Sequence, residues 1–507
     1  MSPSRAWQAV RSSDATVLIL LALSRVLLHT LTNGQYGFHR DELTTLDDAR
    51  HLAWGYVAYP PLAPFIGRIE LEMFGTSLTG FRVFAAVAQG VALVLTGLMA
   101  RELGGKRLAQ VVAALAVAIA PLSLASGVLF QYVSFDYLWW VLIAYLVIRL
   151  LKSEDPRWWV AIGAVIGLGM ETKYTMAFFV AGIVAGVLLT PARRYLKSPW
   201  LWCGVALSLL VFLPNLVWQA HHAFISLDFL QYIHGRDIRI GRTSGFLKEQ
   251  PIVSANPFTV PLWLAGLLYF FIVPDRKRYR LMGWLFVVPF LLFFIAKSRS
   301  YYIAPAYPML LAAGAVLGER WVTSLTAGWA RLVRGLTWSG LAVGGLIAAA
   351  LILPIAPVNT PWWNVVNKGN DAFREEIGWP DLVETVARIR DSLPAAERAR
   401  VGILAGNYGE AGAIDLYGPA HGLSRALSGI NSYWLRGYDD PPPQTLILVG
   451  FTRDFAERTF ESCALAGHNT NRYGVKNEET TEHPDIFVCR GLRQPWPEFW
   501  AHFKYFG

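Results

Sequence analysis

The sequence is poor in charged residues, and this shortage limits what the chain can be. Charged residues make up 16% of its 507 positions, whereas 54% are hydrophobic. An average soluble domain carries roughly 25% charged residues. The apolar residues also come in runs of about 17 to 22, the length that crosses a bilayer as a helix. These features predict a multi-pass membrane protein rather than several soluble domains.

Cysteine is also scarce, with three in the whole chain. Cys203 lies in an apolar run, whereas Cys463 and Cys489 lie in the polar C-terminal part. The latter two can form a disulfide if that part faces an oxidising compartment. Two unpaired buried thiols are an equal alternative, because the sequence does not give their separation.

The sequence has no basic low-complexity tail and no nucleic-acid recognition motif to accompany its net charge of +9. Its Lys and Arg residues fall mainly in the short loops between apolar runs, which is typical of membrane topology. We therefore expect membrane lipids, and no nucleic acid, as partners. His221 and His222 have no further ligand at a recognisable spacing, so no metal site is predicted, although carboxylates can still hold a divalent ion.

The apolar runs predict about 11 spans. Positive residues gather in alternate connections, so the positive-inside rule places these and the N-terminus in the cytoplasm. We interpret the first run as a retained span, because no small-residue cleavage site follows it. The outer face then receives loops 34–78 and 220–256 and the segment from 357 onward. The predicted spans are 15–33, 79–100, 107–126, 136–151, 157–172, 174–190, 199–219, 257–274, 281–296, 302–318 and 336–354.

Residues 357–507 have a soluble composition and follow the predicted membrane domain 1–356. An amphipathic helix at 381–392 and short apolar strands at 401–406, 445–450 and 485–491 predict an α/β extracytoplasmic domain. Asn407–Glu410 follows the first of these strands. This loop is either a ligand-binding loop or a helix-capping turn, with equal weight.

Several acidic residues crowd into Tyr36–Pro64, just beyond the first span. Taken alone, Asp41 and Glu42 would be a solvated loop face, but an amphipathic segment that can lie on the membrane surface follows them and favours a fixed catalytic pair. Asp136 opens the fourth predicted span from the outer side. It is either an N-terminal cap or a second catalytic acid that faces the same cavity.

Cations on the predicted outer face break the positive-inside rule where the acids lie, which suits an anionic lipid substrate. Each alone can instead extend to a lipid headgroup. The predicted substrate-binding residues are Arg40, Tyr59, Arg82, Lys173, Lys297, Arg299 and Tyr302.

The phrases HRDEL, ARHLAWGY, PPL, LPNLVWQ and YYIAPAYPML together resemble bacterial members of glycosyltransferase family 39. This protein mannosyltransferase-like group has the GT-C membrane fold and is related to the lipid A aminoarabinose transferases. The C-terminal phrase NYGEAGAIDLYGP is similar to the extracytoplasmic domain of one bacterial branch.

The resemblance implies transfer of a hexose or pentose from a polyprenyl-phosphate donor to an acceptor on the outer face of the bacterial cytoplasmic membrane. The acceptor would be an envelope glycan, lipid or protein. In the family, the Asp of the Asp-Glu pair is catalytic, and it falls on Asp41. Tyr59 and Thr44 stand where the aminoarabinose transferases carry a lysine and an arginine that hold the lipid phosphate. Arg40, Lys173, Lys297 or Arg299 would have to replace them.

Inverting transfer needs a base for the acceptor hydroxyl and positive charge for the departing phosphate. Asp41 can be the base and nearby Lys and Arg can supply the charge, so we expect no required cofactor. The rival hypothesis is a lipid or sugar transporter or flippase. Such a protein normally shows inverted repeats and broken spans, and neither is clear in this sequence.

Overall fold

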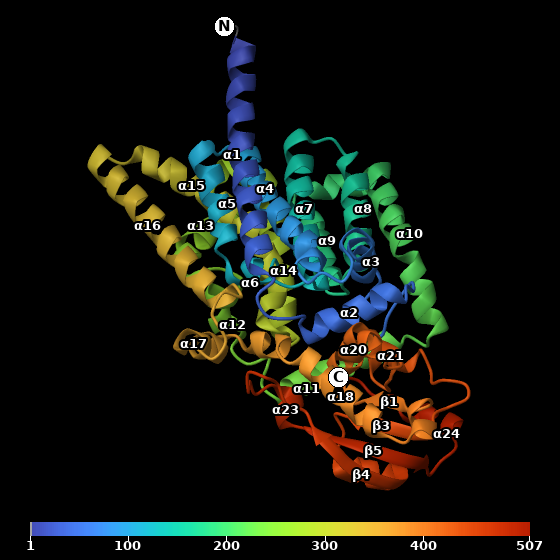
Figure 1. Cartoon of the computed structure of the whole chain (residues 1–507). Coiled ribbons are helices and arrows are strands. Elements are labelled where there is room, and N and C mark those ends of the chain that lie inside the picture. The colour runs from blue at the N-terminus through green and yellow to red at the C-terminus, as the bar shows by residue number, and fades with distance from the viewer. Residues whose placement is uncertain (1–2) are drawn as a thin grey trace.

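The computed structural model describes residues 3–507, with side chains from residue 14 onward except those of residues 274–276. The N-terminal residue, which we predict to be cytoplasmic, lies outside the described part. Figure 1 shows a bundle of long helices with a smaller mixed domain packed against one end. Helix α2 (Arg40–Arg50) lies between the bundle and this domain.

Each predicted apolar run coincides with a helix of the bundle. Among the described residues, seven helices are long and apolar enough to cross a membrane, or up to nine if each of two bent pairs forms one span. Helices α5 and α8 are apolar but shorter, so the number of spans stays a prediction. The bundle helices are α1 (Pro3–Thr32), α4 (Val83–Glu102), α5 (Arg107–Ala118), α6 (Pro121–Ala125), α7 (Tyr132–Ser153), α8 (Trp158–Met170), α9 (Met176–Leu189), α10 (Pro199–His221), α13 (Val260–Phe271), α14 (Arg280–Ile295), α15 (Tyr307–Ser324) and α16 (Ala327–Ile352).

The two long loops predicted on the outer face contain helices of their own. The first holds α2 and α3 (Leu62–Phe74), separated by Pro60 and Pro61. Proline at both positions excludes a continuous helix, so the chain turns there. The second loop holds α11 (Ile225–Arg239) and α12 (Phe246–Glu249). Both loops lie at the end of the bundle that faces the C-terminal domain, for which we use residues 357–507.

The C-terminal domain contains a five-stranded sheet in the order β2-β1-β3-β5-β4. Strand β1 pairs in parallel with β2 and β3, and the pairs β3–β5 and β4–β5 are antiparallel. The strands are β1 (Gly402–Ala405), β2 (Ala426–Leu427), β3 (Thr445–Val449), β4 (Phe460–His468) and β5 (Asp485–Leu492). The helices are α17 (Pro361–Gly369), α18 (Trp379–Ser392), α19 (Ala395–Arg398), α20 (Tyr408–Tyr417), α21 (Asn431–Trp434), α22 (Arg453–Thr459), α23 (Glu478–Thr481) and α24 (Trp496–His502).

The three predicted strands are confirmed as β1, β3 and β5, and the predicted amphipathic helix is confirmed as α18. The sequence did not predict β4, because it is an edge strand whose side chains are mostly exposed and carry no apolar alternation. Cys463 of β4 lies directly opposite Cys489 of β5. The two form a disulfide, which resolves the alternative that the sequence left open.

An apolar cluster continues from the bundle into the C-terminal domain. It joins Phe38 and Leu43 of the 34–78 loop to Trp379 and Ile414 of the domain, all of them buried. Glycine at position 412 makes this contact close, because a Cβ there would lie 2.8 Å from the Leu43 Cβ. Helix α20 therefore packs directly on α2.

Candidate active site

A cavity of about 460 Å³ lies where α2, the bundle and the C-terminal domain meet. Its walls come from segments that are far apart in the sequence. Of the predicted site residues, Asp41, Tyr59, Lys173, Arg299 and Tyr302 line it. The other polar residues in the lining include Thr44, Thr45, Gln131, Tyr132, His234, Arg236, Asp237, Arg242 and Tyr408.

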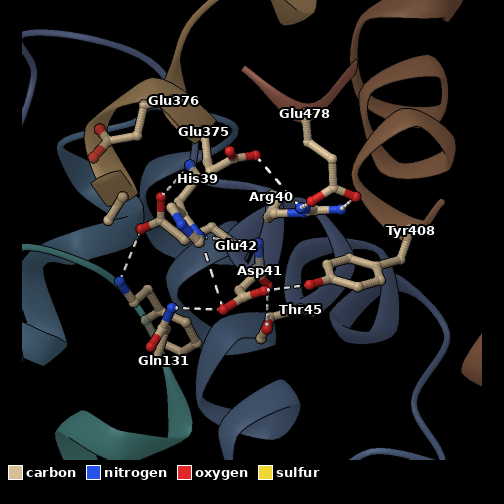
Figure 2. A network of polar contacts seen from close by, with 12 residues as sticks. His39, Arg40, Asp41, Glu42, Thr45, Gln131, Glu375, Glu376, Tyr408 and Glu478 are labelled. Atoms are coloured by element: carbon tan, nitrogen blue, oxygen red, sulfur yellow. Dashed lines mark hydrogen bonds and ion pairs between the residues drawn. The ribbon is translucent and has the colours of Figure 1, made fainter. Parts of the chain in front are cut away.

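Asp41 is held by a side-chain donor on each carboxylate oxygen (Figure 2). The Tyr408 hydroxyl donates to Oδ1 at 3.0 Å, and the Gln131 amide donates to Oδ2 at 3.0 Å. The Asp41 side chain keeps 43% of its surface exposed, which leaves it accessible to a substrate in the cavity. Its backbone N–H donates to Nδ1 of His39, the residue that caps α2. The carboxylate is thus both fixed and accessible, as a general base requires.

Glu42, the other member of the predicted catalytic pair, is fully buried and does not line the cavity. It accepts hydrogen bonds from the backbone N–H groups of His39 and Phe130, both at 2.8 Å. Arg82 donates to its two oxygens at 2.8 and 2.6 Å. Adjacent helical residues point about 100° apart, so Asp41 faces the cavity while Glu42 faces the interior.

Arg82 is likewise fully buried and outside the cavity lining, although we predicted it to bind substrate. Besides Glu42, it donates to the backbone oxygens of Asn33 and Gly37 and to Glu376 of the C-terminal domain. Arg82 and Glu42 therefore hold the segment that leads into α2 in place, and neither lines the cavity.

Two of the predicted cations lie in the cavity wall. The Lys173 ammonium is 4.1 Å from the centre of the Tyr302 ring and 5.5 Å from that of Tyr132. Arg299 forms a bidentate ion pair with Asp237 of α11, donating to its two carboxylate oxygens at 2.6 and 2.9 Å. Arg236 and Arg242 add positive charge from the 220–256 loop. The sequence indicated this loop as outer structure but gave no signal that singled out its arginines.

Lys297 and Asp136 do not line the cavity. Asp136 is buried one turn inside α7 and accepts a hydrogen bond from the Trp140 indole at 3.1 Å. The N-cap of α7 is Gln131, so the capping interpretation of Asp136 was wrong. Tyr59 does line the cavity, and its hydroxyl donates to Asp48 at 2.6 Å.

Arg40 reaches away from the cavity and contacts the C-terminal domain. Its guanidinium pairs with Glu478 and lies 3.5 Å from Glu375. It also lies over the Tyr408 ring, 5.0 Å from its centre. Asn407 caps α20, so the capping interpretation of the Asn407–Glu410 loop is confirmed. The next residue, Tyr408, nevertheless enters the cavity.

Two carboxyl groups of the C-terminal domain, Glu375 and Glu410, should make the free energy of unfolding depend on pH. Burial is the main cause that raises the pKa of Glu375 to about 7 and that of Glu410 to about 8, and repulsion from Glu479 is the second cause in both. A carboxyl whose pKa is raised on folding stabilises the fold fully below its ordinary pKa and loses this contribution as pH rises through the folded value. A difference of one in pKa between the folded and the unfolded protein corresponds to about 1.4 kcal/mol in the free energy of unfolding. Thermal unfolding should therefore move to lower temperature between about pH 4.5 and pH 8.

The matched control is Glu410→Gln. The N–H groups of Gly406 and Asn407 donate to the Glu410 carboxylate, and glutamine keeps an oxygen that can accept these hydrogen bonds. This variant should show a shallower fall in unfolding temperature over the same pH interval. An unfolding temperature that rises with pH in both proteins would contradict the prediction.

Among the described residues there is no group of three or more His, Cys, Asp or Glu side chains that could hold a metal ion. Independence from metal stays a prediction.

The chain is similar in sequence to known membrane glycosyltransferases. Residues 58–218 match the family model described as dolichyl-phosphate-mannose-protein mannosyltransferase. The lipid A galacturonosyltransferase RgtD of Rhizobium johnstonii is 24% identical over 68% of this chain and 72% of its own length. The undecaprenyl phosphate-alpha-4-amino-4-deoxy-L-arabinose arabinosyl transferase 1 of Pseudomonas fluorescens is 27% identical over 55% of this chain and 52% of its own.

The likeness to solved structures extends over nearly the whole chain. The apo crystal structure of ArnT from Cupriavidus metallidurans matches with a TM-score of 0.56 at 14% identity, covering 96% of this chain and 98% of that one. The structure of the same protein bound to undecaprenyl phosphate matches with a TM-score of 0.51, covering 93% and 97%. This likeness confirms the predicted fold: a mainly helical GT-C membrane bundle with a small C-terminal sheet domain.

Proposed function

We propose that this chain, a GT-C membrane glycosyltransferase related to bacterial family 39 and the aminoarabinose transferases, moves a sugar from a polyprenyl-phosphate donor to a hydroxyl of an envelope lipid. The observation that carries the proposal is the cavity in which an accessible, doubly fixed Asp41 shares a wall with Lys173 and Arg299. The two curated relatives described above are named as transferases, and one structural relative was crystallised with undecaprenyl phosphate. These names favour a transferase over the transporter or flippase.

The proposed reaction is a single inverting displacement. The acceptor oxygen attacks the anomeric carbon and forms the new glycosidic bond, while its proton passes to the Asp41 carboxylate. The bond from the anomeric carbon to the phosphate oxygen breaks, and the polyprenyl phosphate leaves with the electron pair. Lys173 and Arg299 stabilise the charge on the departing phosphate. No metal ion is needed in this scheme.

We place the cavity on the outer face of the bacterial cytoplasmic membrane. The Cys463–Cys489 disulfide supports this side for the C-terminal domain, because such bonds persist in oxidising compartments. The distribution of positive loops supports the same orientation, with a cytoplasmic N-terminus. A polyprenyl chain would then stay in the bilayer while its phosphate enters the cavity.

The activity can be tested by comparing envelope lipids from cells with and without the gene by mass spectrometry. The proposal expects a lipid that gains the mass of one hexose or pentose, or a derivative of these, only when the gene is present. A sugar found instead on an envelope glycan or protein would keep the chemistry and change the acceptor. Identical lipids, glycans and proteins in the two strains would contradict the proposal.

Lys173→Met should weaken both donor binding and turnover. The substitution removes the ammonium that lies 4.1 Å from the centre of the Tyr302 ring and keeps an unbranched side chain of similar length. Loss of one electrostatic contact to a leaving group reduces kcat by about 10²–10³-fold. Initial rates with a purified polyprenyl-phosphate sugar would measure this. Lys248→Met, at an exposed position of α12 outside the cavity lining, is the matched control. Equal rates for the two variants would remove Lys173 from the phosphate site.

A further inference from the structure

We propose that Tyr408 is a positioning residue for Asp41, so that the C-terminal domain completes the active site of the membrane domain. This inference rests on the proposed function, in which Asp41 is the general base. Asp41 and Tyr408 are separated by 367 positions in the chain, yet the Tyr408 hydroxyl donates to Asp41 Oδ1 at 3.0 Å. Figure 2 shows the phenol pointing at the carboxylate from the first turn of α20.

The local sequence sets the position of this phenol. Asn407 caps α20 by accepting from the N–H of Glu410, and Glu410 accepts in return from the N–H of Asn407. This reciprocal capping box fixes the first turn of the helix, where Tyr408 is the first residue. Glycine at 409 lets that turn approach α2, because a Cβ there would lie 2.9 Å from the Arg40 Cβ.

The domain also holds α2 at both of its ends. At the first end, Arg40 pairs with Glu478 and lies over the Tyr408 ring. At the last turn, Arg436 of the domain pairs with Asp47 and Asp48. These charge-assisted contacts fix the helix that carries Asp41 relative to α20. The Tyr408 hydroxyl therefore meets the carboxylate in one defined geometry.

The consequence for the reaction is an oriented base. With Gln131 donating to Oδ2 and Tyr408 to Oδ1, the carboxylate is held in one orientation while it lines the cavity. A base that is already oriented avoids the loss of freedom that would otherwise accompany proton transfer. The C-terminal domain would thus affect turnover without binding either substrate through this residue.

The test is Tyr408→Phe, which removes only the hydroxyl and keeps the ring beneath Arg40. Steady-state rates would be measured with the full-length protein in liposomes, using the polyprenyl-phosphate sugar and acceptor lipid that the cell comparison identifies. A hydrogen bond to a charged group corresponds to a factor of about 10 to 100, so we expect kcat to fall by this factor. The KM for the donor should change less than about twofold, because the hydroxyl donates to Asp41 and the proposal gives it no part in holding the phosphate.

Two controls separate this role from a structural one. Tyr417→Phe changes the same residue type on the same helix, at a position outside the cavity lining, and should leave kcat unchanged. In an Asp41→Asn background, Tyr408→Phe should cause no further loss, because a residue that acts through Asp41 has nothing left to orient.

Three results would overturn the inference. One is a wild-type kcat in Tyr408→Phe, and another is a loss that Tyr417→Phe reproduces. The third is a full additional loss in the Asp41→Asn background. If the wild-type protein itself transfers no sugar from any polyprenyl-phosphate donor, the proposed function fails, and the role of Tyr408 fails with it.

Discussion

Replacing Asp41 with Asn should reduce sugar transfer by about 10²–10⁴-fold, the usual contribution of a general base. Asn keeps the shape of the side chain and an oxygen that can accept from Tyr408, but it cannot take the proton of the acceptor hydroxyl. Release of polyprenyl phosphate from a radiolabelled donor would measure the loss. The thermal unfolding temperature should stay close to that of the wild-type protein.

Asp228→Asn is the matched control, because Asp228 lies exposed on α11, near the same end of the bundle but outside the cavity lining. This variant should retain full activity. Turnover that survives in Asp41→Asn would rule out Asp41 as the base. The buried Asp136 would then be the next carboxyl to test, because it interacts electrostatically with Lys173.

The membrane bundle could be predicted because a long apolar run can form little other than a membrane-spanning helix. Each run became a helix, and the short connections left little freedom in how neighbouring helices meet. The limit is visible at α5 and α8, whose helices are shorter than the runs that predicted them. The length of an apolar run does not show where a helix stops or bends.

The candidate site could be predicted only in part, because residues brought together from distant segments leave no local pattern. Asp41 stood out in an acidic cluster just beyond the first apolar run, and Lys173 stood out as a cation on the predicted outer face. Gln131 and Tyr408 had no such signal, because an amide or a tyrosine is unremarkable in a loop. The same holds for Arg236 and Arg242, which lie in a loop already rich in charge.

Charge alone also could not separate a ligand from a structural partner. Arg82 opened a predicted span and Arg299 lay in a predicted turn, both on the outer side, and both were predicted to bind the substrate. The structure buries Arg82 between two carboxylates and leaves Arg299 in the cavity wall. One of the two carboxyl groups, Glu376, is 294 positions from Arg82 and belongs to the C-terminal domain, so no local pattern pairs them.

This burial makes Arg82 the position where substitution should be most destabilising. Arg82→Met would leave Glu42 buried without its cation, and breaking a buried ion pair in this way costs about 3–5 kcal/mol. It would also free the backbone oxygens of Asn33 and Gly37, which Arg82 now holds. We expect a large fall in the unfolding temperature of the detergent-purified protein and a low yield. Arg82→Lys, which keeps the charge but not the forked geometry, should lie between this variant and the wild type.

The controls for Arg82 are substitutions of its two acidic partners, Glu42 and Glu376. Burial raises the pKa of Glu376 to about 8, with the Arg82 charge opposing the rise. Because burial favours the uncharged form of Glu376, Glu376→Gln should cost less stability than Arg82→Met, which leaves Glu42 unpaired. The double variant Glu42→Gln, Arg82→Met should recover part of the loss, because no unpaired charge then remains buried. If Arg82→Met alone were as stable as the double variant, the Arg82–Glu42 ion pair would not be what stabilises the segment that leads into α2.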